Sequence, residues 1–397
     1  MKECPLHGVQ MPFDDEFYAD PYATYEKLND TGRAHRVCID DRPPEWVLTR
    51  YDDVREALRD QRFARNRRYA RPDFPLEQIP EILHHGNLLT EDPPEHTRLR
   101  QFIIHAFTPK QSRKVEPRIA QLVTELLDGL DGKADLVADF ASPLSITIIG
   151  ELIGVPRDAQ AEFRSWCDDI IAGSPEVTRR GGERLLGYFA ELVEEKRARP
   201  GDDLISDWLA ARATDGSTLT DQELVNMPFY LFLAGQDTTV GTLGNAILGL
   251  LTHPELIARL RADPGLGPDA VEELMRWDSS ALRGWRRWAS EDITVGDVTI
   301  PAGDGVNLSI AAAHRDPRHY PDPDTIDIDR TDRAHLGFGR GPHACPGSEL
   351  ARIELRVALC ALFDRFPDLR LAVSTEDLRW RESTFIRMLT ALPVALR

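Results

Sequence analysis

The sequence predicts a mainly α-helical fold, built as one large domain with small β-sheets, and three observations support this expectation. Helical spacing of apolar residues dominates from Pro94 to about Met275. Strand-like patterns are short and occur before and after that region. No repeat and no Ser/Gly-rich linker divides the 397 residues, so separable modules are not expected. We therefore expect a single domain, 1–397, with a β-containing N-terminal subregion, a helical body and a C-terminal region at about 1–90, 91–290 and 291–397.

The N-terminal subregion is expected to form a small sheet followed by a helix. Ala34 to Asp40 and Glu45 to Arg50 read as strands on either side of a turn-like Asp-Arg-Pro-Pro sequence at 41–44. The next segment, Tyr51 to Arg59, has helical spacing.

The helical body is expected to contain several amphipathic helices. Apolar residues recur at helical spacing in Ile119 to Leu130, Leu144 to Ile153, Arg184 to Arg197, Leu204 to Ala213, Thr220 to Leu251 and Pro254 to Arg261. The longest apolar stretch, from about Leu224 to Leu251, is interrupted by Gly235, Gln236 and Asp237, which argues against a membrane span.

The C-terminal region changes pattern three times. Ile293 to Leu308 predicts a hairpin with Gly296-Asp297 at its turn. Asp316 to Gly347 is long, irregular and rich in Pro, Asp, Gly and Arg, and such segments are often functional. Ser348 to Phe366 predicts a helix, and Asp377 to Leu396 predicts terminal strands.

Charge and cysteine content limit the partners and the compartment. The formal net charge of −18 repels polyanions, so nucleic acid and anionic membranes are not expected as partners. The N-terminus shows no apolar leader segment. Five widely spaced cysteines without a CxxC motif argue against a disulfide scaffold or a structural zinc site, and favour a cytoplasmic protein.

The segment 335–347 places four glycines and two prolines around Cys345, directly before a predicted helix. Pro346 suits a first helical turn, so Cys345 is expected near a helix N-terminus, where free N–H groups stabilise a thiolate. Such a thiolate is a metal ligand or a nucleophile. The alternative is a buried, inert cysteine. A dinucleotide-binding role for Gly339 to Ala344 is rejected, because no strand precedes it.

At this point the sequence resembles a known family. The string Phe338-Gly339-x-Gly341-x-His343-x-Cys345-x-Gly347 resembles the haem-ligand signature of the cytochromes P450. Three further motifs resemble those of this family and occur in its order: Asp92 to Arg100, Ala234 to Thr239, and Glu273-x-x-Arg276. The four motifs span most of the chain and resemble the soluble bacterial type.

The resemblance implies a role for each of these residues. Cys345 would be the thiolate ligand of the iron of haem b, with Phe338 and Ala234 beside the haem. The haem propionates would be held by His96, Arg100, Arg287 and His343. Asp237 and Thr238 would deliver protons during O2 activation. Glu273 and Arg276 would form a buried structural network. Without the resemblance, a helix kink at 234–239, a solvated helix face at His96 and Arg100, and an exposed ion pair at Glu273 and Arg276 remain open.

Substrate contacts are the least specified part of the site. By resemblance Leu233, Ala281, Leu282 and Arg283 would border the pocket. Two residues differ from the family pattern: Ser280 replaces the commoner Pro, and Arg283, which could equally point to solvent, replaces an apolar residue. The segments Arg62 to Leu89 and Phe163 to Phe189 resemble variable access regions. They leave the identity of the substrate open.

The expected function is a haem-thiolate monooxygenase that uses O2 to hydroxylate, epoxidise or oxidatively couple a small, mostly apolar organic substrate, in secondary metabolism. No flavin or NAD motif is present, so electrons are expected from a ferredoxin and its NAD(P)H-dependent reductase. The expected docking patch comprises Arg98, Lys110, Arg113, Lys114, Arg340 and Arg352. The alternatives are a peroxide-driven peroxygenase and a non-catalytic haem-binding sensor. Oligomeric state is left open.

Overall fold

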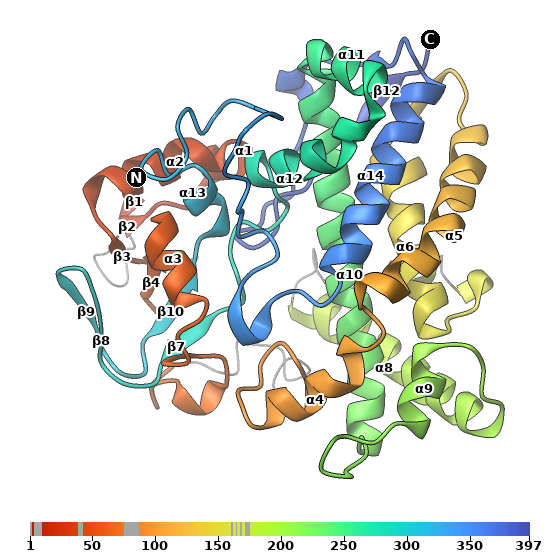
Figure 1. The fold of residues 1–397 in the computed structure, drawn as a ribbon. Helices are drawn as coiled ribbons and strands as arrows, with labels where there is room; N and C mark the ends of the chain where they lie inside the picture. Colours follow the sequence, from red (N-terminus) through yellow and green to blue (C-terminus); the bar gives the residue numbers. More distant parts are fainter. Residues whose placement is uncertain are drawn as a thin grey trace.

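The protein divides into a side rich in strands and a larger helical body (Figure 1). The computed structural model describes residues 2–3, 10–38, 43–74, 87–159, 162–163, 165–166, 169–170 and 175–397. The N-terminus lies on the strand-rich side, and the C-terminus lies at the far end of the helical body (Figure 1). A mainly helical fold with small sheets is confirmed.

The main sheet joins segments from both ends of the chain. Its seven strands lie in the order β1 (Lys2–Glu3), β2 (Gln10–Met11), β3 (Ala34–Val37), β4 (Glu45–Leu48), β10 (Gly305–Leu308), β7 (Arg287–Ala289) and β5 (Phe63–Ala64). Strand β10 runs parallel to β4, with Val306 opposite Trp46. This long-range pairing supports the single-domain expectation, which stays a prediction. Strands β3 and β4 confirm the two predicted N-terminal strands in shorter form, while the first half of the predicted turn at 41–44, residues 41–42, lies outside the described residues, as do residues 39–40 of the first predicted strand.

Four short helices flank this sheet: α1 (Asp15–Ala19), α2 (Pro21–Thr31), α3 (Tyr51–Ala57) and α13 (Ile310–His314). Helix α3 confirms the predicted helix at 51–59, whereas α1, α2 and α13 were not predicted. Their start signals are visible in retrospect, because Asp14 and Asp20 cap α1 and α2 through their side chains, and Pro21 occupies the first turn of α2.

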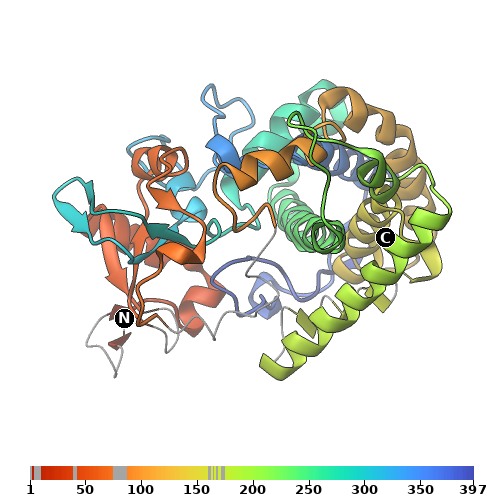
Figure 2. The same ribbon diagram turned by 90° about the horizontal axis from the view of Figure 1, so that it is seen from below.

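The helical body surrounds one central helix. Its helices are α4 (Glu95–Ile104), α5 (Pro109–Asp128), α6 (Ser142–Ile153), α8 (Pro175–Ala198), α9 (Leu204–Ala210), α10 (Asp221–Leu251), α11 (Pro254–Ala262), α12 (Gly267–Trp277) and α14 (Ser348–Arg365). Helix α10 is seen nearly end-on, ringed by other helices, in Figure 2. All six predicted helical segments of the body are confirmed, and α5 and α8 begin earlier than predicted.

Helix α10 is central because it is apolar on most of its circumference. It begins with a capping box, in which the Thr220 hydroxyl accepts from the Glu223 amide and the Glu223 carboxylate accepts from the Thr220 amide. It remains α-helical from Asp221 to Leu251, including the predicted point of interruption at 234–239. Among the helices of the described residues, none has the length and apolar character needed to cross a membrane.

The C-terminal region is simpler than predicted. Strands β8 (Ile293–Val295) and β9 (Val298–Ile300) form the predicted hairpin, with Gly296 at φ 63° in its turn. Residues 305–308, which were expected to belong to that hairpin, join the main sheet as β10 instead. Of the terminal strands predicted in 377–396, only β12 (Pro393–Ala395) forms among the described residues, between β11 (Arg370–Leu371) and β6 (Lys133–Asp135). The irregular segment 316–347 is confirmed, with one short 3-10 turn at Gly341–His343.

Candidate active site

Cys345 lies on a tight loop between the 3-10 turn and α14. The Cys345 amide donates to the Phe338 carbonyl at 2.8 Å, which closes the loop. Gly341 has φ 73°, and a Cβ there would lie 2.9 Å from the Leu58 carbonyl oxygen, so the loop needs glycine at this position. Helix α14 starts only at Ser348. Pro346 therefore forms a turn before the helix. The expectation that it occupies the first turn of the helix is wrong.

The surroundings of Cys345 act on its thiol in opposite directions. The side chain is accessible from a hollow of about 420 Å³ that Phe338, Arg340 and Arg352 help to line. It lies deep enough in the protein for burial to raise the pKa of the thiol, while a hydrogen bond from the Gly347 amide and the charges of Arg100 and Arg352 lower it. On balance the pKa of the thiol is raised, so these three groups offset burial only in part, and a bound metal cation would complete the stabilisation of the thiolate.

Basic side chains gather beside this loop, and they include the four predicted propionate ligands. The rings of His96 and His343 lie 4.0 Å apart. Arg100 donates to the Ala344 carbonyl at 2.7 Å, and Arg287 donates to the Phe63 carbonyl at 2.8 Å. The structure thus brings together residues of α4, of β7 and of the cysteine loop.

Burial and mutual repulsion weaken the proton affinity of this cluster. Burial, together with Arg100 and Arg65, lowers the pKa of His96 to about 4. Burial lowers the pKa of Arg287 to about 10. Burial, with the charges of Arg65, His96 and Arg287, also lowers the pKa of His343. Such shifts are those of cations that lack sufficient negative charge around them.

Arg65 belongs to this cluster and was missed by the sequence reasoning. It is buried, and burial and the charge of Arg287 lower its pKa well below the usual value. Its Nη1 donates to the Leu89 carbonyl at 3.0 Å, while its Nε has no partner among the described residues. In the sequence it stands among Arg62, Arg67 and Arg68 and reads as part of a solvated basic run.

These residues fit a haem. Asp92, whose charge acts on both Arg65 and Arg287, is already bonded to the backbone amides of Arg65 and Asn66 at 2.9 and 2.8 Å. The buried Nε of Arg65 and Nε2 of His96 have no hydrogen-bond partner in the described part of the chain. A buried dianion beside the cysteine would supply the missing acceptors and charge, and two propionates meet this requirement.

One face of α10 stays partly accessible within an otherwise buried helix. Ala234, Gly235 and Thr238 lie on this face, whereas Asp237 is buried. The Thr238 hydroxyl donates to the Ala234 carbonyl at 2.6 Å. The Asp237 carboxylate lies 3.8 Å from the Arg381 guanidinium. The two predicted proton-delivering residues are therefore adjacent, but only the threonine is partly open to its surroundings.

Glu273 and Arg276 form a buried ion pair, with both side chains 0% exposed and a distance of 2.8 Å. Arg276 also donates to the carbonyls of His314, Pro323 and Thr325, at 3.0, 2.7 and 2.9 Å. Glu273 in turn accepts from the Asp327 amide and from Arg330. The pair thus ties α12 to the irregular segment that leads to Cys345, and it is not the exposed pair that the isolated pattern allowed.

The predicted substrate contacts lie in different surroundings. Ala281 pairs with Ile386, and the Arg283 guanidinium lies 5.3 Å from the centre of the Phe385 ring. Leu233 is partly buried against the main core. Leu282 is buried in a separate core cluster with Phe13, Phe17, Tyr25 and Leu28. Its side chain is therefore committed to the N-terminal packing.

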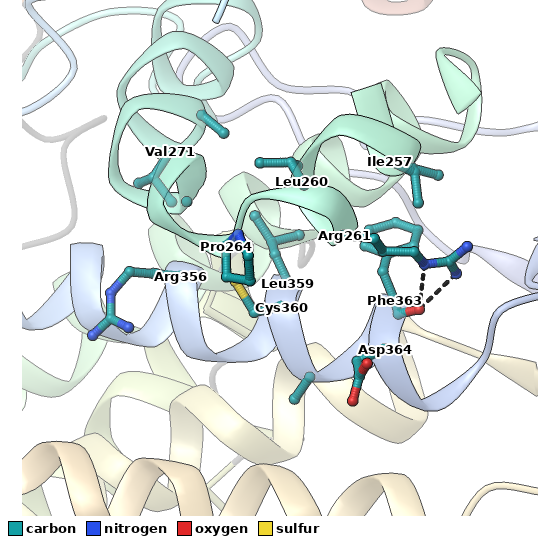
Figure 3. A pocket seen from close by; sticks show the side chains of 13 residues that line it. Ile257, Leu260, Arg261, Pro264, Val271, Arg356, Leu359, Cys360, Phe363 and Asp364 are labelled. Carbon is teal, nitrogen blue, oxygen red and sulfur yellow. Dashed lines mark hydrogen bonds between the residues drawn. The ribbon is translucent and has the colours of Figure 1, made fainter. Parts of the chain in front are cut away.

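A second cavity, of about 380 Å³, lies between α11, α12 and α14 (Figure 3). Apolar side chains such as Ile257, Leu260 and Val271 line it, and Cys360 lies at its base. None of the predicted site residues lines this cavity. The candidate active site is therefore the one built around Cys345.

Comparisons with known proteins agree with this geometry. The family described as Cytochrome P450 matches residues 179–263 and 268–378. Cytochrome P450 107B1 of Saccharopolyspora erythraea is 40% identical, covering 97% of each chain. Cytochrome P450 monooxygenase PikC of Streptomyces venezuelae is also 40% identical, over 96% of this chain and 92% of that protein. The solved structure of the bacillaene polyketide synthase cytochrome P450 PksS of Bacillus subtilis superposes with a TM-score of 0.91 at 36% identity, over 98% of this chain and all of that one. The chain therefore belongs to the cytochrome P450 family.

Proposed function

We propose that this cytochrome P450 is a monooxygenase that binds haem b through Cys345 and acts on a small, mostly apolar organic substrate. The observation that carries the proposal is the largely buried basic cluster of Arg65, His96, Arg287 and His343 beside the cysteine loop, whose side chains form no ion pair with the carboxylates of the described residues. These residues would hold the propionates, and Arg100 would assist them. When bound, the haem supplies the redox chemistry by which O2 is activated.

The residues of α10 would hold and move protons during this reaction. The Thr238 hydroxyl donates its hydrogen bond to the Ala234 carbonyl at 2.6 Å. The lone pairs of the Thr238 oxygen therefore stay available to accept a hydrogen bond from the reacting side of the site. Asp237 is the neighbouring acid, and its carboxylate lies 3.8 Å from the Arg381 guanidinium. An acid next to an alcohol supports the use of O2 over a peroxide-only reaction.

Ala281, Leu233 and Arg283 remain proposed as residues that border the substrate. Arg283 would do so with its guanidinium against Phe385. Leu282 is left out because its side chain packs in the N-terminal core. The relative PksS is named for polyketide biosynthesis and PikC for monooxygenase activity, which supports a role for this enzyme in secondary metabolism.

We propose that a ferredoxin and its NAD(P)H-dependent reductase supply the electrons, in the cytoplasm, where NAD(P)H is available. The ferredoxin would dock over the hollow beside Cys345, to which Arg59 and Arg340 contribute positive charge, whereas Arg333 there is paired with Asp269 at 2.9 Å. Two members of the expected patch are already engaged: Arg98 pairs with Glu223 and Glu95, and Arg352 pairs with Glu272 at 2.6 and 2.9 Å. Docking would therefore depend more on Arg340 and on the exposed residues at the start of α5, Lys110, Arg113 and Lys114.

The test is turnover of purified, haem-loaded enzyme with candidate substrates chosen by their shift of the main absorption band. We expect product from O2, NADPH, ferredoxin and reductase. Product from hydrogen peroxide alone, with none from O2 and electron donors, would indicate a peroxygenase. A spectral shift without product under both conditions would indicate a haem-binding sensor.

A further inference from the structure

Side-chain hydroxyl groups bond to the carbonyl groups of α10 on both sides of Thr238. From α6, the Ser145 hydroxyl lies 3.1 Å from the Gly235 carbonyl and 3.2 Å from the Gln236 carbonyl. On the C-terminal side, the hydroxyls of Thr242 and Ser280 each lie 2.7 Å from the Thr238 carbonyl. The stretch that carries Asp237 and Thr238 is thus held by hydroxyls of two other segments.

The Ser280 contact connects α10 to the segment proposed to face the substrate. The Thr242 hydroxyl also lies 2.9 Å from the Ser280 hydroxyl, so the two can donate in sequence, from Thr242 to Ser280 and from Ser280 to the Thr238 carbonyl. Both side chains are buried. The carbonyl of Ser280 accepts from the Arg387 amide at 2.7 Å, which fixes the backbone of this segment.

Close backbone packing supports the same connection. A Cβ on Gly241 would lie 2.8 Å from the Ser280 Cβ and 3.1 Å from the Arg387 carbonyl oxygen. The 279–283 segment therefore touches α10 within one turn of Thr238. A proline at position 280, the commoner residue by the resemblance described above, could pack there but has no hydroxyl to donate.

The direction of these carbonyl groups matters for the reaction. A helical carbonyl has two lone pairs, one for the amide four residues later and one for an additional donor. A buried hydroxyl anchored in another element fixes where that carbonyl points, and so limits bending of the helix at that turn. Thr238 lies in the turn that is fixed in this way, and its hydroxyl is directed by its bond to Ala234.

We propose that Ser280 and Thr242, with Ser145 on the opposite side, are positioning residues that hold the turn of α10 around Thr238. By holding this turn they determine the coupling of the reaction, which is the fraction of the NADPH electrons that oxidises substrate and does not form H2O2. The proposal rests on the monooxygenase function proposed above. When protons reach oxygen in the wrong order, O2 takes up two electrons and two protons and leaves as H2O2, and the substrate is not oxidised. A looser turn should raise this share of H2O2.

The experiment compares Ser280→Ala and Thr242→Val with Thr242→Ser, which keeps the hydroxyl. Thr252→Val is the matched control, because the Thr252 hydroxyl makes the same type of bond to the Leu248 carbonyl at 3.0 Å, but at the far end of α10. Two readouts are taken on haem-loaded protein: amide hydrogen exchange over residues 235–242, and H2O2 formed per NADPH consumed.

Loss of one hydrogen bond corresponds to about a fivefold change in a local opening equilibrium. We expect exchange at 235–242 to become about fivefold faster in Ser280→Ala and Thr242→Val, with a larger H2O2 share. Thr242→Ser and Thr252→Val should match the wild type in both readouts.

Three results would overturn the proposal. If Ser280→Ala and Thr242→Val equal the wild type in both exchange and H2O2 share, the hydroxyls do not stabilise the turn around Thr238. Faster exchange with an unchanged H2O2 share would reduce the hydroxyls to a packing role. If the wild type consumes no NADPH with O2, the monooxygenase function itself fails, and this proposal fails with it. The exchange data distinguish this case from a failure of the hydroxyls to hold the turn, because exchange is measured without turnover.

Discussion

Replacing Glu273 by glutamine should destabilise the protein strongly, although it changes a single atom of the side chain. The Glu273 carboxylate accepts from Arg276 through two bonds at 2.8 and 2.9 Å, from the Asp327 amide at 2.9 Å and from Arg330 at 3.2 Å. In Glu273→Gln, the two buried guanidinium groups of Arg276 and Arg330 lose the one carboxylate with which they pair among the described residues. The free energy of unfolding should fall by about 3–5 kcal/mol, as when a buried ion pair is broken.

The expected shift in melting temperature follows from the size of the chain. An unfolding entropy of about 2.1 cal/mol/K per residue gives roughly 0.8 kcal/mol/K for 397 residues. A loss of about 3–5 kcal/mol therefore lowers Tm by about 4–6 °C. The segment 316–347 should loosen as well, because Arg276 holds its carbonyls, and haem retention should fall with stability.

Thermal unfolding followed by circular dichroism is the assay. The matched control is Asp329→Asn, which removes the charge from an exposed ion pair with Arg259 at 2.9 Å and should cost at most about 1 kcal/mol. If Glu273→Gln melts within about 1 °C of the wild type, the buried pair does not hold the cysteine-bearing segment, and the reasoning is refuted.

Three further predictions concern the site and its edges. Arg65→Leu and Arg287→Leu should each lower the haem-to-protein ratio after purification, because each removes a buried cation of the propionate cluster; an unchanged ratio in both would argue against that role. Burial opposes ionisation of Glu272, but hydrogen bonds and charge from His335 and Arg352 bring its pKa down to about 2. Because this pKa lies below the ordinary 4.5, the ionised Glu272 stabilises the fold above about pH 4.5, and that stabilisation is lost as the pH falls toward 2. The Tm difference between wild type and Glu272→Gln should therefore shrink over this pH range; a difference that widens would contradict the prediction. Arg113→Glu should slow reduction by ferredoxin at low salt, whereas Arg199→Glu, at the exposed end of α8, should not; equal rates would remove α5 from the docking surface.

The elements that the sequence predicted correctly are those whose signal lies within one continuous segment of the chain. Helix α10 and the hairpin β8–β9 each follow from apolar spacing and a turn signal within one continuous segment. Strand β10 was assigned to the wrong partner because pairing with β4 depends on residues far apart in the chain, which periodicity does not encode. Helices α1 and α13 are five residues long, too short for a periodic pattern to show.

The candidate site divides in the same way. The cysteine loop could be recognised because its glycines are required locally, as at Gly341 with its positive φ and its close approach to Leu58. Arg65 could not be recognised, because only the folded chain separates it from neighbouring surface arginines and buries it near Arg287. The contacts of Ser280 with Thr238 and Thr242 likewise arise from the packing of two segments that are distant in sequence.

The most direct test of the central claim is the carbon monoxide difference spectrum of the reduced, haem-loaded protein, measured for the wild type, Cys345→Ser and Cys360→Ser. Thiolate ligation by Cys345 predicts the red-shifted main band in the wild type and in Cys360→Ser, and its loss in Cys345→Ser. A band that persists in Cys345→Ser, or that is absent from well-folded, haem-containing wild type, would contradict the assignment of Cys345 and the function built on it.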